Sequence, residues 1–136
     1  AFEKALPYLE FALRSSQHTR FDWLVRRFCI AGRVFAKMLP KAVALCEESV
    51  RLYDSVGFLR LLGELSNMLA AKLTDGTEER KRIFEQACRA FETCEQREPG
   101  SKLTYMNWNF ASAMLNDIGN CRHIAGRARN NCQGFW

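Results

Sequence analysis

The sequence is poor in residues that interrupt helices and in the residue that most often performs catalysis. Its 136 residues include only three prolines, eight glycines and two histidines. Good helix formers such as alanine, leucine, glutamate and arginine dominate the rest, which favours an all-α domain. The length is sufficient for one domain with a hydrophobic core.

No apolar run approaches the ~20 residues that a membrane-spanning helix needs, and no signal-peptide pattern opens the chain. We therefore expect no membrane insertion. The six cysteines include no Cys-x-x-Cys pair, and four fall on apolar helix faces, where a free cysteine behaves as a small hydrophobe. Reduced, buried thiols predict an intracellular, reducing compartment and leave the organelle open. Cys121, His123 and Cys132 lack a fourth ligand, so no metal is expected.

Motifs of known catalytic sites are also missing. The sequence contains no G-x-G-x-x-G, phosphate loop, nucleophile elbow or H-E-x-x-H. His18 and His123 both stand in polar stretches, and the carboxylates are scattered over faces that we expect to be solvated. We predict a protein that is not an enzyme, with no cofactor and no small-molecule substrate.

Apolar residues recur at helical spacing over most of the chain. The expected helices cover residues 2–15, 20–38, 40–53, 56–73, 78–98 and 102–118. Thr77 and Ser101 are placed to cap the last two of them. Gly63 lies inside the fourth, where glycine costs ~1 kcal/mol relative to alanine. A glycine at that position predicts the close approach of a neighbouring helix.

The C-terminal segment has a different composition. From Cys121 onward there are three arginines, no acidic residue and no clear periodicity. We expect Gly119 and Asn120 to end the last helix. The predicted organisation is a helical domain over residues 1–120 and a basic tail over residues 121–136, with a short helix at residues 122–129 as an alternative for part of the tail.

Two features indicate internal repetition. Residues 63–69 and 109–115 share Ser, Met and Leu at matched places, at an offset of 46 (109 − 63). The expected helices also alternate between one apolar face and apolar residues nearly all round. This alternation is typical of helix pairs that bury their apolar faces on one another in a stack.

The segment around residue 90 carries a resemblance to a known family. The small residue Ala87 is followed four positions later by the aromatic Phe91 and three positions after that by the small residue Cys94. Pro99 comes five positions after Cys94. This series resembles the second helix of the tetratricopeptide repeat, with cysteine in place of alanine. The first helix of such a repeat often has Trp or Tyr near its start, where this chain has Trp23 and Tyr105.

The resemblance implies about three repeats of antiparallel helix pairs, stacked as a short right-handed solenoid of about six helices. One repeat is about 12 residues longer than the usual length of roughly 34. Ser66 and Ser112 also stand where a large aromatic residue is expected. Other solenoids of helix pairs therefore stay open.

In such arrays the inner helices line a concave groove that receives a peptide or another helix. The resemblance accordingly implies a protein-interaction scaffold, a segment or subunit of a larger assembly, with a protein or peptide partner. The groove positions are Leu24, Phe28, Arg60, Glu64, Asn67, Met106 and Phe110. The alternative for each is ordinary packing between helices. The lysines and asparagines with which some family members clamp carboxylates are absent, so chaperone-tail binding is not predicted.

A second function class uses the basic residues. An RNA-associated helical-repeat protein would contact the phosphate backbone, and its affinity would fall steeply with salt. The candidate anion contacts are Arg26, Arg27 and Arg33 in the second expected helix, and Arg122, Arg127 and Arg129 in the tail. A solvated basic surface without a ligand is the alternative.

Overall fold

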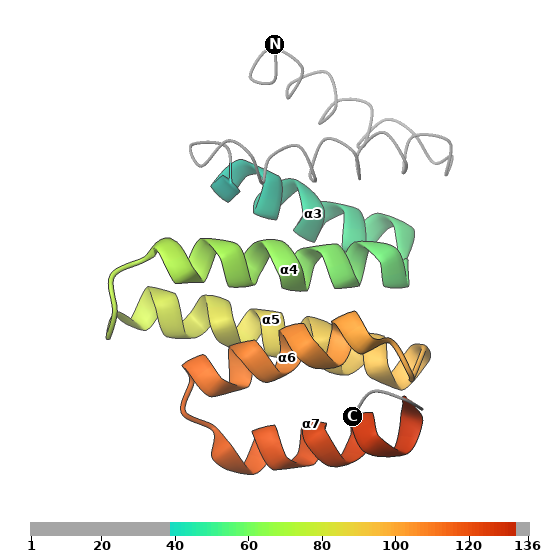
Figure 1. The fold of residues 1–136 in the computed structure, drawn as a ribbon. Coiled ribbons are helices and arrows are strands. Elements are labelled where there is room, and N and C mark those ends of the chain that lie inside the picture. The colour runs from blue at the N-terminus through green and yellow to red at the C-terminus, as the bar shows by residue number, and fades with distance from the viewer. Residues whose placement is uncertain (1–38, 133–136) are drawn as a thin grey trace.

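The computed structural model describes residues 39–132, and this part of the chain is entirely helical (Figure 1). Its helices are α3 (Leu39–Tyr53), α4 (Val56–Lys72), α5 (Glu78–Arg97), α6 (Lys102–Met114) and α7 (Ile118–Asn131). The all-α prediction is confirmed for these residues, which contain no strand. The predictions for Leu24, Phe28, Arg26, Arg27 and Arg33 lie outside the described residues.

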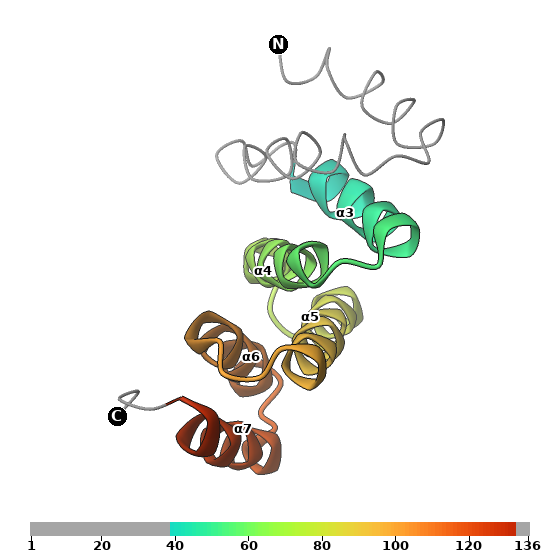
Figure 2. The same ribbon diagram turned by 90° about the vertical axis from the view of Figure 1, so that its right-hand side faces the viewer.

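The helices are stacked in chain order. Each described helix packs against the next one, and α4 also contacts α6 directly. Viewed along the helix axes, α4 and α6 lie on one side of the stack and α3 and α5 on the other (Figure 2). No helix within residues 39–132 is long and apolar enough to cross a membrane.

Two helix starts are fixed by side-chain caps, as the sequence predicts. The hydroxyl of Thr77 accepts a hydrogen bond of 3.3 Å from the backbone N–H of Arg80. The hydroxyl of Ser101 accepts one of 3.4 Å from Thr104. Each cap satisfies a backbone donor that has no partner inside its helix.

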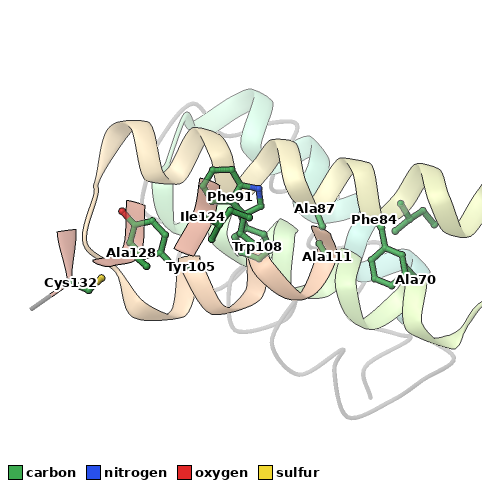
Figure 3. Close-up of a cluster of buried hydrophobic side chains, with 11 residues drawn as sticks. Ala70, Phe84, Ala87, Phe91, Tyr105, Trp108, Ala111, Ile124, Ala128 and Cys132 are labelled. Carbon is green, nitrogen blue, oxygen red and sulfur yellow. The ribbon is translucent and has the colours of Figure 1, made fainter. Parts of the chain in front are cut away.

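The second half of the structure is held by one apolar cluster (Figure 3). Its buried members come from α4, α5, α6 and α7, and the aromatic ones are Phe84, Phe91, Tyr105 and Trp108. A separate cluster joins α3 to α4, including Leu39, Cys46, Phe58 and Leu65. Helix α4 contributes to both clusters and so links the two halves.

The close approach predicted at Gly63 is confirmed. A Cβ atom built on Gly63 would lie 2.5 Å from Cζ of the Phe91 ring, well inside van der Waals contact. Phe91 is fully buried, so its ring lies directly against the α4 backbone. The aromatic residue of the repeat-like series and the glycine of the preceding helix are thus the two sides of one contact.

The expected end of the last helix is wrong. Helix α6 ends at Met114, and Asn116 takes a positive φ of 56° in the following turn. The N–H groups of Asn116 and Asp117 bond to the carbonyls of Ala113 and Ser112, at 3.0 Å each. This is the Schellman arrangement, with asparagine in the left-handed position that glycine usually takes. Gly119 therefore lies inside the next helix.

Helix α7 is longer than the short helix considered for the tail. It covers 14 residues, and the Asp117 carboxylate caps it by accepting a 3.0 Å bond from the N–H of Asn120. Ile124, Ala128 and Cys132 join the apolar cluster with α5 and α6. This part of the basic segment therefore packs on the helical stack.

A polar network attaches α7 to the end of α5. The Glu95 side chain is 7% exposed, and its Oε1 lies 2.7 Å from Arg127 Nε and 2.5 Å from the second guanidinium nitrogen. The Tyr105 hydroxyl donates to the same carboxylate oxygen at 3.2 Å and accepts from the Gly100 N–H at 3.3 Å. A buried carboxylate requires such partners, because an unpaired charge away from water is costly.

Replacing Gly63 by alanine should lower the free energy of unfolding. The added methyl would overlap the Phe91 ring, and overpacking of this kind costs about 1–3 kcal/mol, which equals or exceeds the ~1 kcal/mol helix-propensity gain of Gly→Ala. The measurement is urea unfolding followed by circular dichroism. Adding Phe91→Leu should recover part of the loss, so that the two changes together cost less than their sum.

Gly126→Ala in α7 is the matched control. Nothing lies within 4 Å of the Cβ that this change would add. Here only the helix-propensity gain acts, so stability should rise by up to about 1 kcal/mol. Equal effects of the two Gly→Ala changes would contradict the packing described for Gly63.

Arg127→Ala should destabilise the protein by about 1–3 kcal/mol, because it leaves the buried Glu95 carboxylate without its cation. Arg122→Ala, on an exposed position of the same helix, should change stability by less than about 0.5 kcal/mol. Adding Glu95→Gln to Arg127→Ala should restore part of the loss, since a neutral amide needs no counter-charge. An Arg127→Ala protein as stable as the wild type would refute this role.

Stability should also fall in alkaline solution. Burial raises the pKa of the Cys94 thiol from 9.0 to about 11, and burial likewise raises the pKa of Tyr105. The folded state thus holds these protons more tightly than the unfolded chain does. The contribution of these two groups to the free energy of unfolding is fully present at a pH below their pKa values in the unfolded chain. It is lost as the pH rises through their pKa values in the folded state. Urea unfolding between about pH 8 and 11 should show this decline. Cys94→Ala should make it shallower, and an unchanged slope would exclude the thiol as a cause.

Candidate interaction groove

A surface pocket of about 520 Å³ is lined by residues of α4 and α6. Helix α4 lines it with Glu64, Asn67, Met68 and Ala71, and helix α6 lines it with Leu103, Asn107 and Phe110. Its volume falls in the range of about 300–1,000 Å³ that is usual for ligand sites. The walls combine apolar side chains with two amides and one carboxylate.

Helix α6 extends this pocket with an exposed apolar row. Four large side chains remain in contact with solvent: Leu103 (58% exposed), Met106 (58%), Phe110 (41%) and Met114 (42%). Their spacing places them along one side of the helix. The opposite side, with Tyr105, Trp108 and Ala111, is buried in the core. We call these four side chains the α6 row.

Polar side chains connect the two walls. Arg60 Nε donates to the Thr104 hydroxyl at 3.2 Å, and its guanidinium also lies 3.6 Å from Glu98. Asn67 Nδ2 donates to the backbone carbonyl of Asn107 at 3.0 Å. These bonds hold α4 and α6 at a fixed separation, which sets the width of the pocket.

Phe110 is held in place by a contact with α5. Its ring packs edge-on against Phe84 of α5, with the ring centroids 6.0 Å apart and the planes at 67°. The Arg80 guanidinium lies 5.3 Å from the centroid of the Phe84 ring. The aromatic wall of the pocket is therefore supported by a buried partner while part of Phe110 stays exposed.

The groove positions implied by the resemblance lie close together where the structure describes them. Glu64, Asn67 and Phe110 line the same pocket, and Met106 belongs to the adjoining row. Arg60 has its guanidinium committed to the link between the helices. Sequence reasoning missed Leu103 and Asn107, although their spacing with Phe110, at intervals of four and three residues, places all three on one helix face.

The three tail arginines all lie on α7. Arg127 is paired with the buried Glu95. Arg122 and Arg129 occupy exposed positions. Within residues 39–132, no group of three or more His, Cys, Asp or Glu side chains is placed to hold a metal ion.

No protein-family model, curated protein or solved structure matches this chain. Inferences about function therefore depend on its own geometry.

Proposed function

We propose that this chain is a non-catalytic protein-interaction scaffold, which binds a segment of another protein in the groove between α4 and α6. The observation that carries this proposal is the α6 row, four large apolar side chains exposed beside a polar-lined pocket. Exposed apolar side chains scattered singly are normal on a protein surface, but a contiguous set bordering a pocket is typical of a binding site. The fold that we propose for the whole chain is a short solenoid similar to tetratricopeptide arrays.

Two buried serines support the repeat arrangement. Ser66 of α4 and Ser112 of α6 stand at the 46-residue offset (112 − 66), and both are fully buried. Each hydroxyl accepts a hydrogen bond from a side-chain amide of the following helix: Gln86 at 3.0 Å for Ser66, and Asn120 at 2.7 Å for Ser112. In both helix pairs, α4–α5 and α6–α7, an amide of the second helix thus donates to a buried serine hydroxyl of the first, as expected for two repeats of one unit.

The size of the surface suggests a modest affinity. Full burial of one large apolar side chain contributes about 1.5–3 kcal/mol. The α6 row is already partly covered in the free protein, and association loses translational and rotational freedom. Tight binding would therefore require additional contacts along the stack.

Selection from a random peptide library displayed on phage tests the proposal. The immobilised full chain should enrich peptides whose binding falls at least tenfold on the double variant Leu103→Asp/Met106→Asp, because charges replace the apolar contacts. Leu52→Asp is the matched control: Leu52 is 53% exposed but lies on α3, outside the groove. Unchanged thermal melting of both variants would show that the fold is intact.

Two results would contradict the proposal. One is failure to enrich any peptide that is sensitive to the Leu103→Asp/Met106→Asp change. The other is RNA binding at low salt that Arg122→Ala/Arg129→Ala abolishes, with no groove-dependent peptide binding. That second result would favour the RNA-associated alternative.

A further inference from the structure

The exposed apolar row of α6 lies on a stretch of the chain without charge. Residues 103–116 include no Asp, Glu, Lys, Arg or His, although charged residues make up 26% of the whole sequence. The solvent-facing side of a helix normally carries charged and polar residues. Depletion of charge and enrichment of methionine and aromatic residues are typical of the centre of a protein interface. The α6 row, with two methionines and one phenylalanine, has this composition.

The spacing of the α6 row is that of a seam between two helices. Its members, Leu103, Met106, Phe110 and Met114, follow one another at intervals of three, four and four residues. Such intervals align apolar side chains along the line where two helices pack side by side. Helix α6 also lies further out than α4 on the side of the stack that the two helices share (Figure 2). The row is therefore accessible to a helix of another molecule.

A charge of opposite sign stands at each end of this uncharged stretch. Lys102 is the first residue of α6, and Asp117 follows the turn at its end. Both occupy exposed positions. Lys102 stands one turn before Met106 and Asp117 three residues after Met114, so both border the α6 row. One Asp117 oxygen caps α7, and a carboxylate has further acceptor capacity.

We propose that two copies of this chain associate through α6, with the two helices antiparallel about a twofold axis. Leu103 of each copy then lies opposite Met114 of the other, and each Lys102 lies near Asp117 of the other. This inference goes beyond the proposed function. The row that receives a partner segment is covered by a second copy when that segment is absent.

The physical argument is one of self-complementarity. A twofold interface uses the same patch on both copies, so the patch must match itself when reversed. The antiparallel arrangement brings unlike charges together at both ends of the helix pair, whereas a parallel one would bring like charges together. It also opposes the two helix dipoles. Because residues 103–116 carry no charge, no ion has to leave water at the centre of the pair. A single helix pair is a small interface, so the dimer is expected to be weak.

Sedimentation equilibrium of the full chain, with a thiol reductant to prevent disulfides, should show a monomer–dimer equilibrium that depends on concentration. Leu103→Asp/Met106→Asp should abolish the dimer, whereas Leu52→Asp on α3 should not. Lys102→Glu should raise the dimer dissociation constant about tenfold, because the symmetry turns two attractive pairs into two repulsive ones. Lys41→Glu, at an exposed position of α3, is the matched control and should leave the constant unchanged.

Carbodiimide cross-linking tests the orientation of the two helices, since this reagent joins a lysine amine directly to a carboxylate. Within one copy, Lys102 and Asp117 are 15 residues apart (117 − 102), which is about 20 Å along the helix. A direct link between them must therefore join two copies. Mass spectrometry should find this link in the cross-linked dimer. Asp117→Asn, which retains a side-chain cap for α7, should remove it.

Lys102→Glu should not harm the fold, because an acidic residue suits the first turn of a helix, and thermal melting checks this. Three results would overturn the inference: a chain that stays monomeric at all concentrations, a dimer insensitive to the α6 variants, or a dimer without the Lys102–Asp117 link. If that chain still selects groove-dependent peptides, the proposed function stands. A dimer that meets the expectations, without any groove-dependent peptide, would contradict the proposed function alone.

Discussion

The contact between Gly63 and Phe91 is the constraint on which the described structure depends most. The missing side chain lets the Phe91 ring lie against the α4 backbone, at a distance that no larger residue would allow. Helix α5 then presents Phe84 and Ala87 to the cluster that it shares with α6 and α7. Interiors packed at crystal-like density transmit such constraints, since there is little free volume to absorb a displacement.

The groove follows from this packing and from the polar links across it. Because α4 and α6 both pack with α5, they lie side by side, and the bonds from Arg60 and Asn67 fix their spacing. The same bonds engage the side-chain donors of Arg60 and Asn67 near the groove. The residues that set the separation of α4 and α6 thus also use part of the hydrogen-bonding capacity of the groove.

Much of this architecture could be predicted from local patterns. Apolar periodicity predicts α3, α4 and α5 to within about two residues at each end, Thr77 and Ser101 identify two helix starts, and Gly63 identifies the close approach. These features succeed because their causes lie within a few residues of sequence. Helix α7 was predicted only as an alternative, a short helix over residues 122–129, because Asn116 takes the left-handed position for which Gly119 was expected.

The roles of charged and polar residues were harder to predict, because their partners are distant in sequence. Arg127 was a candidate for anion contacts, yet it pairs with Glu95, 32 residues earlier. Asn67 lines the pocket, but its bond to α6, like that of Arg60, joins residues 40 or more positions apart and was not predicted. For Glu64 and Phe110, the resemblance to the tetratricopeptide repeat implied a place in a groove, but the hydrogen bonds around them require three-dimensional coordinates.

The paired serines have a consequence for how the stack can change. Ser66 and Ser112 are fully buried, and each hydroxyl accepts a hydrogen bond from an amide side chain of the next helix. If either following helix slid by one turn, about 5.4 Å, a buried hydroxyl would lose its amide donor even where apolar contacts could be remade. Apolar surfaces tolerate several alignments, whereas a buried hydroxyl tolerates few. The two serines therefore fix the register of each helix pair. A conformational change in which one helix slides lengthwise along the other would be unfavourable.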